Sequence, residues 1–433
     1  MKYRLATLGC KVNEYESSFY QEQLENMGFS EAEPKEAADV IIVNTCTVTN
    51  TAAAKSRQKI RHLQKSSPDA LICVVGCYAQ MMGEEEREAL EADLIIGSAH
   101  KADFGKLLSK VLKEKKRVDV VEESRTQQDM DYMPIGSFSH QHRAFLKVQD
   151  GCNQFCTYCQ IPLARGPERS LPKEDVIKTA RALSQAGHKE IVLTGIHTGR
   201  YHFRADNLES LLKALLENTP EDVCYRLSSI EITEVTDGIL DLVAENPRLL
   251  PHLHIPVQSA CNETLKRMGR PYTIEEFEQR VKEIRKRIPN ISISTDVIAG
   301  FVQESDEEFE TTLRNLEKLS FSFLHAFPYS RRKGTAADRM SGFNSGDVIK
   351  ERTARLLELS EKLRLKDMAR FDHVTVLVER PDAHENNIWT GYSEHYHPVR
   401  IESGKPLSGR VEVDVTPLSD GVYFGHIDGD DQL

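Results

Sequence analysis

The sequence predicts an α/β protein that is built from three parts. Short apolar runs alternate with helical patterns through residues 1–115, and the same rhythm repeats six times through residues 143–371. Strands that alternate with helices favour parallel sheets. The remaining residues form only short β-leaning runs between Gly, Pro and Asp turns. We therefore expect an N-terminal parallel-sheet α/β domain, a central (β/α)6-type partial barrel and a small C-terminal β-barrel.

The N-terminal part contains short apolar runs separated by helical patterns. Expected strands are Tyr3–Leu8, Val40–Val43, Ala70–Val75 and Leu94–Ile96, and expected helices are Glu14–Met27, Ala52–Leu63 and Phe104–Leu112. Charged residues 113–117 and polar residues 122–131 interrupt this pattern. We expect a first domain over residues 1–115 and a linker over residues 116–142.

The central part repeats a strand and then a helix. Expected strands are Ala144–Val148, Glu190–Thr194, Tyr225–Ile232, His252–Val257, Ile291–Ile298 and Phe321–Tyr329. Expected helices are Glu174–Ala186, Leu208–Asn218, Gly238–Glu245, Ile274–Ile288, Asp306–Leu319 and the long Val348–Phe371. We place this domain at residues 143–366 and expect its chemistry at the carboxyl ends of the strands.

The last part, residues 367–433, has a different pattern. Expected strands are His373–Glu379, Asn387–Tyr392, Val399–Ile401, Arg410–Val415 and Val422–Ile427. Short strands between tight turns are typical of a small β-barrel of the oligonucleotide-binding type.

Composition narrows the class of protein. Of the 433 residues, 39% are hydrophobic, which is enough for a sizeable core. The apolar stretches are too short to span a bilayer and the N-terminus lacks a signal-peptide pattern, so we expect a cytoplasmic protein with no membrane partner. A net charge of -11 argues against non-specific coating of nucleic acid. Because disulfides are rare in the cytoplasm, the nine cysteines indicate metal or redox chemistry.

Three cysteines stand close together directly after the first expected barrel strand. Cys152, Cys156 and Cys159 lie on a loop at the carboxyl edge, where three thiolates can hold three corners of an iron–sulfur cluster and leave one iron open. The alternative is a structural zinc site, which normally requires a fourth Cys or His at regular spacing. The next Cys or His in the chain that could serve as this fourth ligand is His188, which lies at the far end of a helix.

Three more cysteines follow three different strands of the N-terminal part. Cys10, Cys46 and Cys77 each come at the end of an apolar run, so a parallel sheet would bring them to one edge. They suit a second cluster, and the alternative is that they are buried structural thiols. Cys73, Cys224 and Cys261 lack such a context and are expected to be packed or idle thiols.

These motifs together resemble the methylthiotransferases, a subfamily of radical S-adenosylmethionine (radical SAM) enzymes. The resemblance rests on Thr7–Ser17, Asn44–Val48, Gly76–Gln80, Gly151–Cys159, Ile161–Gly166, His252–Ser259 and His325–Ser330. Gln160 departs from the pattern, because an apolar residue usually follows the third cysteine of the central triplet.

The resemblance implies an N-terminal methylthiotransferase domain, a radical SAM domain and a C-terminal TRAM domain that binds RNA. It also implies two [4Fe-4S] clusters. The cluster on Cys152, Cys156 and Cys159 would bind S-adenosylmethionine, and the one on Cys10, Cys46 and Cys77 would bind or supply sulfur. A methylthio group is then added to carbon 2 of an adenine in tRNA, and no catalytic side chain beyond the clusters is expected. An electron donor such as flavodoxin is implied, and the sulfur donor is left open.

Two runs favour one branch of the family. Cys10–Asn13 and Thr47–Gln58 most resemble the branch that modifies N6-threonylcarbamoyladenosine next to the anticodon, at position 37. Because that substituent bears a carboxylate, we expect a positive partner, with Lys11 and Arg331 as candidates. The alternatives are the branches that act on isopentenyladenosine tRNA or on a ribosomal-protein aspartate, and a non-catalytic iron–sulfur scaffold that binds RNA.

Two further sets of residues are candidates for ligand contacts. The expected contacts to S-adenosylmethionine are Tyr158, Gly195, Ser229, Glu231 and Gln258. The expected contacts to RNA are Lys11, Lys55, Arg57, Lys59, Arg61, Arg331, Arg332 and Lys333, for which the alternative is a solvated charged face. The acidic C-terminal part is poorly suited to phosphate, and there we expect Arg400 or stacking by Tyr392 and Tyr396 to meet RNA.

Overall fold

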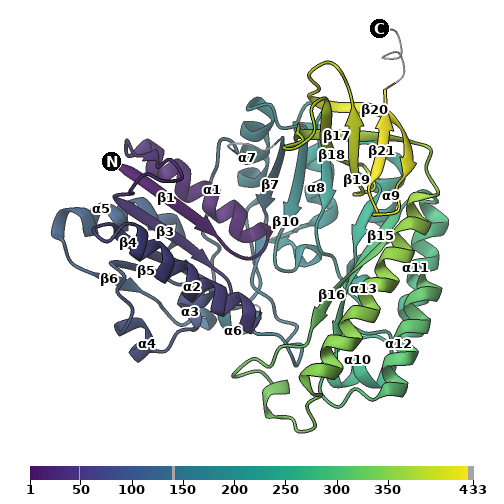
Figure 1. Cartoon of the computed structure of the whole chain (residues 1–433), viewed down its shortest axis with the longest axis horizontal. Coiled ribbons are helices and arrows are strands. Elements are labelled where there is room, and N and C mark those ends of the chain that lie inside the picture. The colour runs from purple at the N-terminus through teal and green to yellow at the C-terminus, as the bar shows by residue number, and fades with distance from the viewer. Residues whose placement is uncertain (48, 139–141, 428–433) are drawn as a thin grey trace.

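The computed structural model describes residues 1–47, 49–138 and 142–427. It contains a parallel sheet with its helices, an open barrel of six strands and a small closed barrel (Figure 1). The predicted α/β class and its three parts are confirmed. Val48 of one quoted motif, residues 139–141 of the expected linker and the last six residues of the chain lie outside the described parts.

The N-terminal sheet has the strand order β2-β1-β3-β4-β5-β6, and all its strands run parallel. The strands are β1 Lys2–Thr7, β2 Ser30–Glu31, β3 Val40–Thr45, β4 Leu71–Gly76, β5 Leu94–Ile96 and β6 Val118–Val120. The helices are α1 Lys11–Asn26, α2 Asn50–Ser66, α3 Cys77–Met81, α4 Glu84–Glu88 and α5 Phe104–Glu114. Helices α1 and α5 pack with the core of one sheet face, whereas α2 packs with the core of the other.

The linker prediction was wrong in one respect. β6, inside the expected linker, pairs with β5 and forms the edge of the sheet. Its central Asp119 accepts a hydrogen bond from Arg87 Nε at 2.9 Å. A three-residue edge strand with a charged centre carries too little apolar pattern to be recognised between charged neighbours.

The open barrel consists of two three-stranded parallel sheets. The first contains β7 Arg143–Lys147, β10 Glu190–Thr194 and β13 Cys224–Leu227, and the second contains β14 His252–His254, β15 Ser292–Ala299 and β16 Phe323–Pro328. Isolated bridges between Tyr225 and Leu249 and between Ser229 and His254 join the two. β13 and β14 are shorter than predicted. Ile232–Glu234 form a 3-10 turn, and Pro256 cannot donate to a sheet ladder.

Helices cover the outside of the barrel. They are α7 Lys173–Gln185, α8 Leu208–Asn218, α9 Asp237–Glu245, α11 Ile274–Arg287, α12 Asp306–Leu319 and α13 Gly346–Met368. Two shorter helices lie by the cysteine loop: α6 Ile161–Arg165 packs against α3, and α10 Asn262–Met268 ends where the Met268 carbonyl accepts a hydrogen bond from Thr157 N. Two antiparallel pairs of two-residue strands complete this part: β8 Gln149–Asp150 with β9 Arg169–Ser170, which enclose the cysteine loop and α6, and the hairpin β11 His202–Phe203 with β12 Asp206–Asn207.

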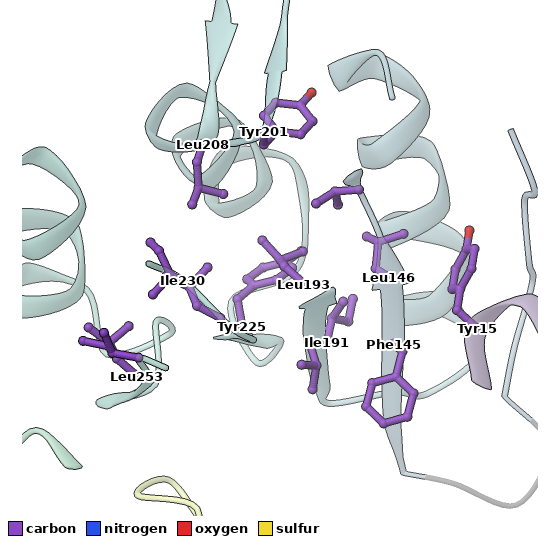
Figure 2. Packing of buried hydrophobic residues seen from close by; sticks show 14 of the residues in the cluster. Tyr15, Phe145, Leu146, Ile191, Leu193, Tyr201, Leu208, Tyr225, Ile230 and Leu253 are labelled. Atoms are coloured by element: carbon purple, nitrogen blue, oxygen red, sulfur yellow. The ribbon is translucent and has the colours of Figure 1, made fainter. Parts of the chain in front are cut away.

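One hydrophobic core runs from α1 into the barrel. Figure 2 shows Tyr15 of α1 beside Phe145 and Leu146 of β7, and Ile191 and Leu193 of β10 follow. The Tyr15 hydroxyl donates to the Met133 carbonyl at 2.7 Å. Because the core is continuous, the N-terminal sheet is held in a fixed position against the barrel.

The C-terminal strands form the closed barrel β17-β18-β19-β21-β20. They are β17 His373–Pro381, β18 Ile388–Ser393, β19 Pro398–Glu402, β20 Gly409–Pro417 and β21 Tyr423–His426. Arg226 of β13 donates to the Ser393 and Glu394 carbonyls, and His397 lies 2.8 Å from Asp367 of α13. The closed barrel therefore packs against the amino ends of the open barrel's strands, opposite the edge where chemistry is expected.

Candidate functional site

The three N-terminal cysteines follow three adjacent strands. Thr7 of β1 pairs with Asn44 of β3, and Thr45 of β3 pairs with Gly76 of β4, so the strands end at the same edge. Cys10 caps α1, Cys46 follows β3 and Cys77 opens α3. Gly9 has a φ of +117°, and a Cβ there would lie 3.1 Å from Cys46 Sγ. The glycine therefore lets the chain before Cys10 pass directly against Cys46.

The three central cysteines lie on the loop after β8. Each sulfur has an N–H donor beside it: Gln154 N lies 3.4 Å from Cys152 Sγ, Arg270 Nη1 lies 3.5 Å from Cys156 Sγ and Ile161 N lies 3.4 Å from Cys159 Sγ. Gly151 starts the loop at a φ of +74°, where a Cβ would stand 1.9 Å from the Pro167 carbonyl oxygen. The loop is thus built around sulfurs that are arranged to carry negative charge.

Burial makes these thiols poor acids on their own. Burial raises the pKa of Cys159 to about 12, and it also raises the pKa of Cys77. A bound cation reverses this, because a coordinating thiol loses its proton outright. All nine cysteines are free of disulfides. Both triplets therefore have the donor set of iron–sulfur sites that leave one iron open.

A histidine supports the first cysteine of the loop. His197 Nδ1 lies 3.6 Å from Cys152 Sγ, and His197 Nε2 lies 2.9 Å from Glu234 Oε1. Burial alone would lower the pKa of His197, but its partners Cys152, Glu168 and Glu234 raise it to about 12. His197 thus lies between the Cys152 sulfur and the Glu234 carboxylate.

A buried charge network connects the two cysteine triplets. Arg165, at the end of α6, donates from Nε to Cys77 Sγ at 3.1 Å and from Nη2 to Asn13 Oδ1 at 2.7 Å. Its Nη1 contacts Glu16 and Asp150, which also pair with Lys147 at 2.8 and 2.6 Å. Burial opposes ionisation of Glu16 and Asp150, but Arg165 and the neighbouring lysines hold the pKa of both carboxyls below the usual range. The network fixes the two loops relative to one another.

A cavity of about 190 Å³ is lined by Cys159 of the central triplet and by Thr47, which directly follows Cys46 of the N-terminal triplet. Its lining comes from the N-terminal part, the cysteine loop and the barrel: Thr47, Thr49, Tyr158, Cys159, Gln160, Ile161, Gln258, Asp296, Ile298, Phe327, Pro328, Tyr329 and Ser330. Buried Arg332 joins these parts, because it donates to Thr47 Oγ1 and Gln160 Oε1, both at 2.6 Å. The unusual polar residue at position 160 is thus a partner for an arginine.

The structure brings only some of the expected S-adenosylmethionine contacts to this cavity. Tyr158 and Gln258 line it. Glu231 forms an ion pair with Arg270, and Ser229 bridges to His254 in the strand ladder. A Cβ at Gly195 would meet Gln149 Oε1 at 2.9 Å, so its small size serves packing against that side chain.

The expected RNA contacts also separate into groups. Lys55, Arg57 and Arg61 are exposed on α2, Lys59 is half-buried there, and none has an ion-pair partner among the described residues. Arg331 pairs with Asp338 at 2.6 Å, and Lys333 is exposed. Arg332 is buried and lacks the solvent access that an RNA contact requires. Lys11 Nζ lies over the Tyr396 ring, 5.3 Å from its centroid.

The RNA contacts expected in the C-terminal part already have partners within the protein. Tyr392 and Tyr396 stack on one another at 5.2 Å, and Arg143 lies over both rings. Arg400 pairs with Glu385 at 2.6 Å. These aromatic rings hold the closed barrel against the open one and do not form a free stacking surface.

Sequence reasoning did not single out several residues of the site. Arg165 stood in a quoted motif without a role, whereas Arg270 and His197 carried no signal of their own. Each contacts a cysteine that is distant in the chain: Arg165 is 88 positions from Cys77, Arg270 is 114 from Cys156 and His197 is 45 from Cys152. Such contacts become visible only when the loops are placed together.

Known families cover both parts that form the site. Residues 2–97 match the uncharacterized protein family UPF0004, and residues 146–316 match the radical SAM superfamily. The threonylcarbamoyladenosine tRNA methylthiotransferase MtaB of Bacillus subtilis (strain 168) is 37% identical, over 94% of this chain and 91% of the relative. The chain belongs to the radical SAM methylthiotransferases.

Other relatives match nearly the whole of this methylthiotransferase. The MtaB of Thermotoga maritima is 38% identical over 92% of this chain and 94% of its own. The tRNA-2-methylthio-N(6)-dimethylallyladenosine synthase of Staphylococcus haemolyticus is 32% identical over 96% and 83%. As a radical SAM enzyme, the methylthiotransferase uses S-adenosylmethionine and a [4Fe-4S] cluster.

Solved structures share the fold of this methylthiotransferase at low identity. The radical S-adenosylmethionine methyltransferase TsrM of Kitasatospora setae superposes with a TM-score of 0.56 at 16% identity, over 76% of this chain and 74% of TsrM.

Within the described residues, no helix is both long and apolar enough to cross a bilayer.

Proposed function

We propose that this enzyme adds a methylthio group to carbon 2 of N6-threonylcarbamoyladenosine at position 37 of tRNA. The relatives named MtaB support this substrate. The observation that carries the proposal is the cavity that Cys159 of one triplet lines together with Thr47 and Thr49, which follow Cys46 of the other triplet. A base bound there would meet both sites at once.

Two groups of residues would hold the cofactors. Cys152, Cys156 and Cys159 would bind the cluster that binds S-adenosylmethionine, and Cys10, Cys46 and Cys77 would bind a second [4Fe-4S] cluster. Together these cofactors supply the radical that activates an aromatic C–H bond and the methylated sulfur that replaces its hydrogen. An electron donor such as flavodoxin belongs to this proposal, and a tRNA substrate would place the enzyme in the cytoplasm.

The chain's own part is to bind, orient and keep water out. Tyr158, Ile298 and Phe327 give the cavity apolar walls that suit the faces of an adenine. Gln258 offers an amide to a base edge or to S-adenosylmethionine. Because the loops that carry both triplets are fixed by Arg165 and Arg332, the geometry between them does not have to form anew in each reaction.

The exposed positive face of α2 is the proposed approach for tRNA. α2 begins at Asn50, whose side chain donates to the Arg331 carbonyl at the rim of the cavity. Lys55, Arg57 and Arg61 extend from that rim along the helix. An unpaired basic stripe that leads to the cavity supports backbone contacts that position the target nucleotide.

The test offers the reconstituted enzyme two tRNAs under reducing conditions, one threonylcarbamoylated and one isopentenylated at position 37. We expect 2-methylthio product on the threonylcarbamoylated tRNA, measured by mass spectrometry of the nucleosides. The matched control is the Cys152→Ala variant, which should give no product on either tRNA. Preferential modification of the isopentenylated tRNA would contradict the assigned substrate.

A further inference from the structure

Three polar side chains face one another inside the open barrel. His254 of β14, Asp296 of β15 and His325 of β16 each place one ligand atom within 4.8 Å of the other two. His254 Nε2 lies 3.1 Å from Asp296 Oδ1, and the rings of His254 and His325 are 5.5 Å apart. Because the three strands are neighbours in the sheet, their register fixes this arrangement.

A fourth residue, Lys11, enters the same barrel interior from the N-terminal part: it lies over Tyr396, whose ring is 5.0 Å from that of His252, and His252 shares the Ser294 hydroxyl with His254. Lys11 begins α1, and its Nζ lies 5.3 Å from the centre of the Tyr396 ring. Burial would raise the pKa of Asp296, but His254, His325 and Lys11 together lower it, so the carboxylate is ionised. Within the described residues Lys11 has no ion-pair partner, and its Nζ rests on the Tyr396 ring. We call Lys11, His254, Asp296 and His325 the lumen cluster.

The lumen cluster continues the cavity. Asp296 lines the cavity together with Ile298, two residues further along the same face of β15. On β16, His325 and Phe327 likewise share one face, and both are exposed. A base held at Ile298 and Phe327 would therefore direct a substituent toward the lumen cluster, on the side away from the ends of the strands.

We propose that the lumen cluster binds the carboxylate-bearing N6 substituent of the target adenosine. Lys11 and His325 would donate to the carboxylate, and Asp296 would accept from the N–H or O–H groups of the substituent. This inference rests on the proposed function and names the residues that select its substrate. An apolar isopentenyl group would leave these polar groups without partners, which disfavours it.

A divalent cation is the other ligand that two histidines and a carboxylate could hold. The structure favours the organic anion. Asp296 Oδ1 is already paired with His254, and the positive charge of Lys11, which helps to lower the pKa of Asp296, also repels a cation.

The experiment measures the dissociation constants of three tRNAs for the cluster-loaded enzyme without S-adenosylmethionine. The tRNAs carry threonylcarbamoyladenosine, isopentenyladenosine or unmodified adenosine at position 37. We expect the wild type to prefer the first by about 10- to 100-fold. Lys11→Met and His325→Phe should reduce that preference to less than about threefold, and Lys11→Arg should retain most of it. His202→Ala is the matched control, because His202 is an exposed histidine on the β11–β12 hairpin.

The outcomes separate the two proposals. If the wild type prefers the threonylcarbamoylated tRNA and both variants keep that preference, the lumen cluster is not the binding site and the proposed function stands. If the wild type itself prefers another tRNA, the proposed function fails. An equal loss of affinity for all three tRNAs also overturns the inference, because selection for the substituent would be unchanged. Tight binding of Mn²⁺ or Zn²⁺ that is abolished by His325→Phe would replace the inference with a metal site.

Discussion

Arg165 Nε donates a hydrogen bond to Cys77 Sγ at 3.1 Å, although the two residues belong to different parts of the molecule. Arg165 ends the short helix that follows the central cysteine loop, and Cys77 opens a helix of the N-terminal domain. The arginine is fully buried, and Glu16 and Asp150 fix its guanidinium from the other side. One side chain thus connects the loop of one cysteine triplet to a sulfur of the other.

This contact predicts a selective spectroscopic effect. Hydrogen bonds to cluster sulfurs tune the reduction potential. Arg165→Lys retains a positive charge, but its single ammonium nitrogen replaces the two guanidinium nitrogens that reach Cys77 and Asn13. We expect the variant to shift the potential of the N-terminal cluster and to leave that of the central cluster unchanged, as measured by redox titration with electron paramagnetic resonance.

The matched variant for this prediction is Arg270→Lys. Arg270 Nη1 lies 3.5 Å from Cys156 Sγ, so its loss should act on the central cluster alone. If each variant shifts the potential of a different cluster, the effects cannot come from a general destabilisation of the fold. If both variants shift both potentials equally, the contacts do not act through individual sulfurs.

Iron content tests the two-cluster proposal directly. Two triplets predict about eight irons per chain. Replacement of Cys152, Cys156 and Cys159 by Ala should remove about half of the iron and abolish cleavage of S-adenosylmethionine. Replacement of Cys10, Cys46 and Cys77 should also remove about half, but cleavage to 5′-deoxyadenosine should continue. The triple variant Cys73, Cys224 and Cys261 to Ser is the control and should keep full iron content. Complete loss of iron from the second variant would contradict two independent sites.

Much of this arrangement could be predicted from the sequence, because its signals are local. The strand ends at Cys10, Cys46 and Cys77 follow apolar runs of strand length, and α8, α12 and β5 have the predicted bounds. Parallel pairing then determines that these ends share an edge. The sequence alone therefore predicts both cysteine triplets as candidate cluster sites.

The remaining parts depend on contacts between distant segments. The position of Arg332 in a basic run after a strand predicts that it lies at an RNA surface. In the structure it is buried between Thr47 and Gln160, 285 and 172 positions away. The sequence likewise predicts that Tyr396 stacks on RNA. In the structure Arg226 lies over this ring, 4.8 Å from its centre, so the ring face is already covered. A pattern of charges or rings does not indicate whether a partner within the protein already occupies it.

The basic face of α2 predicts salt-dependent binding of tRNA. Lys55 and Arg61 are exposed, and each phosphate contact contributes about one unit to the slope of log Kd against log salt concentration. We expect the double variant Lys55→Ala and Arg61→Ala to weaken binding and to lower the slope by about 2, as measured over a salt series.

The control for the α2 variant lies on the other face of the sheet. Lys110 is exposed on α5, and its replacement by Ala should leave affinity and slope unchanged. Cleavage of S-adenosylmethionine without tRNA is measured in parallel to show that the clusters are intact. An unchanged slope in the double variant would identify the α2 charges as a solvated face with no role in binding.

Glu190 predicts how the stability of the fold depends on pH. The side chain is buried at the start of β10, where it pairs with Arg143 at 2.9 Å and Arg226 at 2.8 Å. Burial opposes ionisation, but the two arginines dominate and lower the pKa of Glu190 to about 2 from 4.5. Arg226 in turn holds the closed barrel through the carbonyls of Ser393 and Glu394.

Because the folded-state pKa is below the ordinary value, ionised Glu190 stabilises the fold above pH 4.5, and this contribution disappears as the pH falls toward 2. At neutral pH it is on the order of 3 kcal/mol. We expect Glu190→Gln to unfold more easily than the wild type at pH 7, by about that amount, and the difference to shrink steadily below pH 4.5. Urea unfolding of the cluster-free proteins at several pH values measures this. Glu209→Gln, which removes an exposed pair with Lys213, is the control and should change stability by less than about 0.5 kcal/mol. A difference between Glu190→Gln and wild type that stays constant down to pH 2 would show that the carboxylate charge is not what stabilises this junction.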